Sequence, residues 1–165
     1  MVINTLLTKE DIFRLLSSIP DPEIPVVSIE EMGMLKDVII GDEGCEVIIT
    51  PTYTGCPAMG IIEDDILDLL NKNHVNNPSV KLVYTPAWTT DDMKESTKEK
   101  LKEYGIAPPV HSSCTNWLDV SSVSVECPKC GSENTKVISH FGSTACKALY
   151  KCTQCQEPFE YFKCH

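Results

Sequence analysis

The chain has 165 residues, of which 42% are hydrophobic, so it can form one ordinary domain plus a small module, and its short apolar runs exclude a membrane-spanning helix. The formal net charge is −10. Residues 1–126 are acidic, with nine Lys and Arg against 21 Asp and Glu, whereas residues 127–165 have five Lys against three Glu. This charge balance argues against nucleic-acid binding. The nine cysteines are an odd number, which, without a visible signal peptide, favours reduced thiols in a cytoplasmic protein over a secreted disulfide framework.

The predicted elements of the first domain are helices and strands in the order helix, strand, strand, helix, strand, helix. The expected helices cover residues 8–19, 58–73 and a charged stretch from Thr89 or Thr90 to Tyr104, and the expected strands cover residues 34–40, 45–50 and 80–85. Apolar residues recur at helical spacing in the first two helices, and β-branched residues dominate the strands. This order indicates an α+β fold in which helices pack on a small mixed sheet.

Capping and turn signals mark the ends of these elements. Thr8 can cap the first helix, and Ser28 with Glu31 forms a capping box for one helical turn. Residues 41–44 are typical of a hairpin connection between the first two strands. Gly105 stands just past the last helix, where a left-handed backbone is favoured.

The periodicity of the first domain fades after residue 106. Residues 107–126 contain a double proline and two serine pairs, which are typical of a linker or of a strand lying across the first domain. We therefore expect an α+β domain over residues 1–106, a linker over 107–126 and a separate small module over 127–165.

The small module is marked by two Cys-x-x-Cys pairs separated by 21 residues. The four cysteines are Cys127, Cys130, Cys152 and Cys155. This spacing predicts a zinc ribbon, in which two tight turns bring four thiolates around one tetrahedral ion. Metal binding would supply folding free energy that so short a segment cannot gain from its core. Four unrelated thiols or two disulfides are the alternatives, and four thiolates suit iron as well as zinc.

Four further metal-binding side chains in the tail exceed what one four-sulfur site needs. They are His140, Cys146, Cys164 and His165. They could be ligands of a second site or an alternative set for an iron–sulfur cluster. A buried cysteine at position 146 and a frayed end at positions 164 and 165 would explain them without a metal.

Cys56 is the candidate reactive position of the first domain. It lies between Gly55 and Pro57, at the expected N-cap of the second helix, where backbone N–H groups and the helix dipole would stabilise a thiolate. Such a thiolate could act as a nucleophile or as a soft-metal ligand. A small buried residue at a helix start is the structural alternative.

Asp21 and Glu23 form a second candidate site, because two carboxylates on a proline-braced loop could bind a cation or support a reactive group. A solvated turn or a helix cap is the alternative for such a pair. Thiol-protease chemistry is disfavoured, since His74 and His111 lie in polar segments typical of surface residues. The chain also lacks a phosphate-cradling glycine loop and a dinucleotide fingerprint.

Several motifs resemble a known family. Segments Asp21–Pro25, Thr52–Met59 and Pro86–Thr90 are similar to the iron–sulfur cluster assembly domain of SufT-like proteins. The tail segments Phe141–Tyr150 and Glu157–His165 extend the similarity to the PaaD (PaaJ) family of phenylacetate degradation, which joins such a domain to a zinc ribbon. The resemblance covers essentially the whole chain and is weakest over residues 110–126.

This resemblance implies an accessory or maturation role beside phenylacetyl-CoA epoxidase, whose oxygenase and reductase subunits would be the protein partners, rather than a catalyst acting alone. It implies that Cys56 is a transient cluster ligand or reactive thiol supported by Asp21 and Glu23, and that the ribbon holds a structural Zn²⁺. The alternatives are a structural or electron-transfer subunit of the oxygenase, a thiol enzyme and a nucleic-acid-binding ribbon. No pair of carboxylate–histidine helices for a di-iron site and no flavin motif are visible in the sequence.

Overall fold

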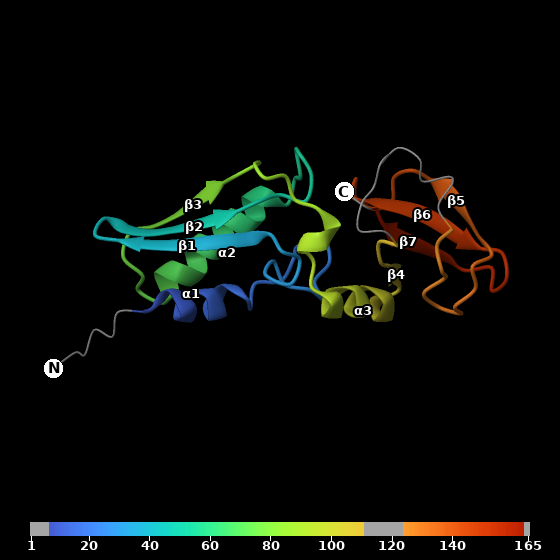
Figure 1. The fold of residues 1–165 in the computed structure, drawn as a ribbon, viewed down its shortest axis with the longest axis horizontal. Helices are drawn as coiled ribbons and strands as arrows, with labels where there is room; N and C mark the ends of the chain where they lie inside the picture. Colours follow the sequence, from blue (N-terminus) through green and yellow to red (C-terminus); the bar gives the residue numbers. More distant parts are fainter. Residues whose placement is uncertain (1–6, 111–123, 164–165) are drawn as a thin grey trace. The chain divides into compact units, whose positions relative to one another are not determined.

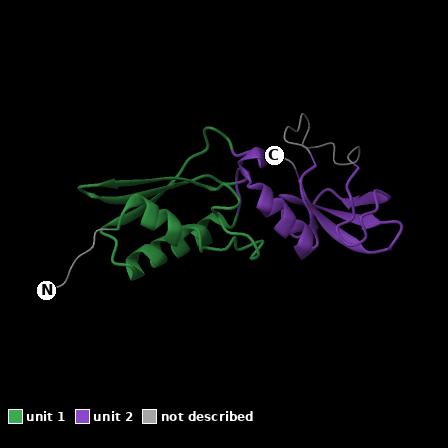
Figure 2. Ribbon diagram, turned by 60° about the horizontal axis from the view of Figure 1, so that its bottom comes forward, with its two compact units in different colours: residues 1–51, 57–87 green, residues 52–56, 88–165 purple. Residues whose placement is uncertain are grey.

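The computed structural model describes residues 7–110 and 124–163. The contacts between residues divide the chain into two compact units (Figure 2). Unit 1 comprises residues 1–51 and 57–87, and unit 2 comprises residues 52–56 and 88–165. No helix in the described ranges is long and apolar enough to cross a membrane.

Unit 1 is a three-stranded mixed sheet with two helices on one face (Figure 1). Its elements are α1 (Lys9–Leu16), β1 (Leu35–Gly41), β2 (Gly44–Ile49), α2 (Met59–Lys72) and β3 (Pro78–Leu82). Strand β1 pairs antiparallel with β2 through a two-residue turn, and β2 pairs parallel with β3 after the crossover through α2. The predicted α+β fold with a small mixed sheet is therefore confirmed.

The core of unit 1 lies between the sheet and the two helices. Alternate residues of β2 are buried, including Val47 and Ile49, as the two-residue period of a half-covered strand requires. On α2, Ile62, Ile66 and Leu70 recur at four-residue spacing and are fully buried. The apolar stripe of this helix thus faces the core and its carboxylates face solvent.

Strand β1 forms one edge of this sheet. The N–H of Val38 donates to the side chain of the preceding Asp37 at 2.8 Å. Asp37 also forms an ion pair with Lys9 of α1. The hydrogen bond from Lys9 and the one from Val38 lower the pKa of Asp37, so this carboxylate is charged at neutral pH.

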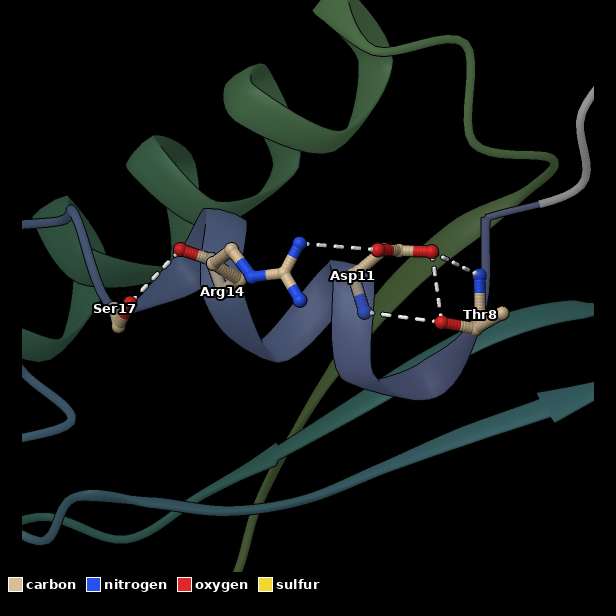
Figure 3. A network of polar contacts seen from close by, with 4 residues as sticks. All are labelled: Thr8, Asp11, Arg14 and Ser17. Carbon is tan, nitrogen blue, oxygen red and sulfur yellow. Dashed lines mark hydrogen bonds and ion pairs between the residues drawn. The ribbon is translucent and has the colours of Figure 1, made fainter.

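Helix α1 begins with the expected cap. The hydroxyl of Thr8 accepts the N–H of Asp11 at 3.2 Å, and the Asp11 carboxylate accepts the N–H of Thr8 at 3.1 Å (Figure 3). These bonds form a capping box that satisfies two backbone donors at the helix start. The carboxylate also accepts the Thr8 hydroxyl proton, and this bond lowers the pKa of Asp11.

We expect Thr8→Ala to destabilise the protein by about 1 kcal/mol, because the backbone donor of Asp11 loses its acceptor. Chemical denaturation monitored by circular dichroism would measure this change. Arg14→Gln is the matched control, since it removes only the long 3.4 Å bond to Asp11 on the same helix, and it should leave the midpoint unchanged. Equal midpoints for Thr8→Ala and the wild type would contradict the role of the box.

The prediction of a single helix ending at Tyr104 is wrong at its N-terminal end, where the chain forms two separate elements. A single 3₁₀ turn, η1 (Thr90–Asp92), is followed by α3 (Glu95–Tyr104). Thr89 and Asp92 close a capping box around the short turn, and Met93 then adopts an extended backbone and buries its side chain. The extended backbone of Met93 and Lys94 interrupts the helical hydrogen bonds. The predicted left-handed Gly105 ends α3 at a φ of 94°.

Unit 2 contains the ribbon, whose strands form a four-stranded sheet together with β4 (Figure 1). Its strands are β4 (Ile106–Ala107), β5 (Thr135–Ser139), β6 (Lys147–Cys152) and β7 (Pro158–Phe162). The strand order is β4-β7-β6-β5, with β4 parallel to β7 and the other pairs antiparallel. Strand β4 pairs with β7, so α3 and β4 belong to the same compact unit as the ribbon. The compact units therefore divide near residue 87. The domain boundary expected at residue 106 stays a prediction.

Aromatic rings fill most of the ribbon core. The ring centroid of Tyr150 lies 5.9 Å from that of Phe159 and 5.6 Å from that of Tyr161. Trp88, which precedes the ribbon sequence, packs edge to face against Phe162, with 6.2 Å between the ring centroids. Phe141 is an aromatic residue of the ribbon that lies outside this core. It is 60% exposed, and the Lys163 ammonium lies 4.7 Å from its ring centroid.

Candidate metal centre and thiol site

The structure brings together the four cysteines of the two Cys-x-x-Cys pairs. Their sulfur atoms all lie within 4.8 Å of one another, with 3.8 Å between Cys127 and Cys155 and 3.6 Å between Cys130 and Cys152. None of the four forms a disulfide. Tetrahedral coordination at about 2.3 Å would place ligand sulfurs roughly 3.8 Å apart, so the donor set fits one zinc ion.

Tight turns position these sulfurs. The Gly131 N–H donates to the Cys127 carbonyl at 2.9 Å, and Gly131 has a φ of 73°, which favours glycine there. The second turn is closed by the Cys152 N–H, which donates to the Glu157 carbonyl at 3.0 Å, and Gln156 has a positive φ of 67°. Both turns are local consequences of sequence, which is why the spacing predicts the centre.

Backbone donors also favour ionisation of one ligand. The N–H of Cys155 donates to the Cys152 sulfur at 3.4 Å, and this bond lowers the pKa of Cys152 to about 6. A backbone hydrogen bond near Ser132 favours the Cys130 thiolate, but burial and the neighbouring thiols raise its pKa to about 12. Backbone donors thus favour the thiolate form of Cys152, which is the form in which a cysteine binds a metal.

The additional tail residues do not join this cluster among the residues that the structure describes. Cys146 is 2% exposed, and its sulfur lies 2.9 Å from the Thr144 hydroxyl. The four-cysteine group excludes it. Cys164 and His165 lie outside the described residues, so their suggested role stays a prediction.

Cys56 precedes α2 instead of capping it, which corrects the expected placement. The cap is Ala58, because the first helical bond runs from the Ile62 N–H to the Ala58 carbonyl. Cys56 is half-buried, and its N–H donates to the Tyr53 carbonyl at 3.3 Å in a turn that contains Gly55 at a φ of 85°. The contribution of the helix dipole is smaller there than at a cap, since it falls off within a turn.

Asp21 organises its own loop. Its side chain is buried and accepts the N–H groups of Glu23 and Ile24, each at 2.8 Å, while its N–H donates to the Val27 carbonyl. This is the capping alternative noted for the acidic pair. Glu23 is half-buried on the same loop. Both residues belong to unit 1 and Cys56 belongs to unit 2, so their cooperation stays a prediction.

Sequence reasoning missed an ion pair that shapes the loop between β5 and β6. Lys147, with a side chain 4% exposed, lies 2.9 Å from the Glu160 carboxylate, which also accepts the Ser143 N–H. A Cβ atom on Gly142 would come within 2.6 Å of the same carboxylate. Gly142, Ser143 and Lys147 are distant from Glu160 in sequence, and the pairing of β6 with β7 brings them to its carboxylate.

We expect Glu160→Gln to remove part of the acid sensitivity of the ribbon. Burial raises the pKa of Glu160, but the hydrogen bonds from Lys147 and Ser143 outweigh this effect and lower the pKa below its usual value. The native state then binds fewer protons than the unfolded state, so this stabilisation is present above about pH 4.5 and is lost as the pH falls through the folded pKa.

Melting temperatures between pH 6 and pH 3 would measure this effect. The wild type should lose more stability on acidification than Glu160→Gln, and taking the difference between the two proteins cancels acid-driven metal loss. Parallel curves would show that the ion pair does not set the carboxylate's pKa.

Comparisons with known proteins agree with both parts of this architecture. Residues 9–77 match the family described as iron–sulfur cluster assembly protein, and residues 112–163 match the PaaD zinc beta ribbon domain. A protein of Escherichia coli, provisionally named as a subunit of 1,2-phenylacetyl-CoA epoxidase, is 49% identical over 93% of this chain and 92% of its own length. The chain belongs to the PaaD family.

Further relatives of this PaaD-family protein cover the first part of the chain. An Fe–S protein maturation auxiliary factor of Porphyromonas gingivalis is 36% identical over 58% of this chain and 92% of its own length. A crystal structure of a domain of unknown function from Bacillus anthracis has 29% identity and a TM-score of 0.53, covering 56% of this chain and 90% of that one. A conserved hypothetical protein of Thermotoga maritima gives 32% identity and a TM-score of 0.50, covering 58% and 94%. The assembly-type fold predicted for the first part is confirmed.

Proposed function

We propose that this protein is an accessory factor of the phenylacetyl-CoA epoxidase system and helps to assemble an iron–sulfur or iron centre in it. The observation that carries the proposal is the similarity to the Escherichia coli epoxidase component over 93% of the chain. The match of residues 9–77 to cluster assembly proteins adds the maturation role. The reductase and oxygenase subunits are the clients we propose.

The cysteines divide this work between two places. Four thiolates within 4.8 Å form a closed site that would hold a structural Zn²⁺ in the ribbon. Cys56 stands apart from them in a half-buried turn, where a single thiol could take and release iron or a transient iron–sulfur cluster. A closed four-sulfur site exchanges its ion slowly, whereas a carrier needs ligands that can dissociate.

Asp21 and Glu23 would support Cys56 indirectly. Because Asp21 accepts two backbone N–H groups at 2.8 Å, its role would be to hold its loop in one conformation. Glu23 lies half-buried on the same loop, and we propose that it supports the thiol site together with Asp21.

Anaerobic reconstitution with ferrous iron and sulfide tests the carrier role. We expect the wild type to gain visible absorption of a bound cluster, and Cys56→Ser to lose it while it keeps its zinc. Cys45→Ala is the matched control, because Cys45 is 3% exposed in β2 and burial raises its pKa. Equal cluster absorption in Cys56→Ser and the wild type would refute Cys56 as the ligand.

A structural or electron-transfer subunit of the oxygenase is the second candidate, favoured by the name of the Escherichia coli relative. This role predicts stable co-purification with the oxygenase, and a redox-active ribbon if electrons pass through it. Metal analysis together with the visible spectrum of the isolated protein separates the roles. A colourless protein containing only zinc excludes electron transfer through the ribbon.

A further inference from the structure

The turn that contains Cys56 belongs to the same compact unit as the ribbon. Residues Thr52–Cys56 group by their contacts with residues 88–165, although the chain up to Pro51 and from Pro57 onward belongs to unit 1 (Figure 2). Thr52 is buried and Cys56 is half-buried. The turn is therefore connected covalently to unit 1 on both sides, while its packing is mainly with unit 2.

The hydrogen bond inside this turn is long. The Cys56 N–H donates to the Tyr53 carbonyl at 3.3 Å, whereas backbone N–H···O bonds are typically about 2.7–3.2 Å. Gly55 has a φ of 85°, and a glycine leaves this conformation as easily as it adopts it. The turn thus depends on packing with residues outside its own sequence to keep one conformation.

The part of unit 2 that precedes the ribbon is attached to strand β7 at two places. The Trp88 side chain is buried, and its ring centroid lies 6.2 Å from that of Phe162 in β7. At the other end of this part, Ile106 pairs with Glu160 of the same strand. Strand β7 pairs in turn with β6, which ends at the metal ligand Cys152.

A turn that is fixed by its own flanking residues is the simplest alternative. Pro51 and Pro57 restrict the backbone on both sides of the turn, and both lie in unit 1, whose fold needs no metal. If these prolines were sufficient, Cys56 would stay equally protected when the ribbon is empty. The packing of the turn with unit 2 favours the opposite expectation.

We propose that metal in the four-cysteine centre holds the Cys56 turn in its folded conformation, so that metal occupancy of the ribbon controls access to this thiol. The four sulfurs fit one ion, and a module of this size loses most of its folding free energy with its metal. When β7 unfolds, Trp88 and β4 lose their partners, and the turn loses the unit with which it packs.

The inference rests on the proposed zinc centre, and it adds a regulation to the proposed carrier role of Cys56. The thiol would be held in one place for its cargo only while the ribbon is loaded with metal. The coupling itself can be measured without any cluster, so it can fail or succeed independently of the carrier role.

Alkylation of Cys56 by iodoacetamide in the full chain, followed by peptide mass spectrometry, tests the proposal. Under anaerobic conditions we expect Cys56 to react about tenfold faster after a chelator has removed zinc than in the zinc-loaded protein, because its turn opens. Cys45 is the matched control in the same molecule. It is 3% exposed in β2 of unit 1, and it should react slowly in both states.

Two variants separate an action through the ribbon from binding of zinc to Cys56 itself. In Cys152→Ser, whose ribbon lacks one ligand, Cys56 should react fast with and without added zinc. In Trp88→Ala, Cys56 should react fast although zinc is bound, since the contact with Phe162 is lost. Phe141→Ala removes an exposed ring from the ribbon instead, and it should keep the slow rate.

The proposal is overturned if removal of zinc leaves the alkylation rate of Cys56 unchanged, or if it accelerates Cys45 as much. Added zinc that slows Cys56 in Cys152→Ser also overturns it, because the metal would then act at Cys56 directly. A Trp88→Ala protein that binds zinc and reacts as slowly as the wild type would contradict the connection through Trp88.

Discussion

Cys152→Ser is expected to release the metal and unfold the ribbon while unit 1 stays folded. The Cys152 side chain is fully buried between the turns, and serine replaces a soft ligand by a hydroxyl that zinc binds poorly. Metal binding contributes roughly 10 kcal/mol or more to folding of such small modules. The aromatic cluster around Tyr150 is too small to replace this contribution.

The unfolding should extend beyond the ribbon sequence to α3 and β4. Ile106 and Ala107 pair with β7, and Trp88 contacts Phe162, so these segments lose their partners when the ribbon unfolds. Hydrogen exchange would measure this directly, since the amides of α3 should exchange faster in Cys152→Ser whereas those of β2 should not.

Chelator treatment of the wild type should reproduce the exchange pattern of Cys152→Ser, and Cys56→Ser, which keeps all four ligands, is the control. Unchanged protection in α3 would mean that this helix folds with unit 1. The folding boundary would then lie near residue 106, as the sequence predicts, instead of near residue 87.

Cys56→Ser is expected to reduce phenylacetyl-CoA epoxidase activity in cells at least tenfold if the thiol passes iron or a cluster to its client. Serine keeps the size of the half-buried side chain but removes the soft donor. Growth on phenylacetate and epoxidase activity in cell extracts would measure the loss. Zinc content and the denaturation midpoint should equal those of the wild type, because Cys56 lies outside the four-cysteine group.

The control for this experiment is Cys45→Ala, which removes another cysteine from the body of the protein without touching the proposed carrier. Its epoxidase activity should match the wild type. Full activity in cells that carry Cys56→Ser would contradict the transfer role and would leave the structural role in the oxygenase as the better interpretation.

Local signals explain how much of this structure could be predicted from the sequence. The hairpin over residues 41–44, the Thr8 cap and the left-handed Gly105 each depend on a few neighbouring residues, and each is confirmed. The sulfur cluster is also predictable, because each Cys-x-x-Cys turn forms locally. The family motifs then place the remaining elements in an assembly-type fold.

Features that depend on tertiary packing could not be predicted in this way. The extended backbone at Met93 and Lys94 divides the expected helix before Glu95, and Met93 is buried at that point. The partners of Glu160 come from another strand and a loop, so no short sequence pattern predicts these contacts.

The capped edge of β1 has a consequence for colloidal behaviour. A bare strand edge is a template on which further chains can add and form aggregates. Here the Val38 amide is already engaged by the charged Asp37, and a second chain approaching that point would have to displace a carboxylate held by Lys9. The Asp37 carboxylate thus disfavours the addition of another strand at this point of the β1 edge.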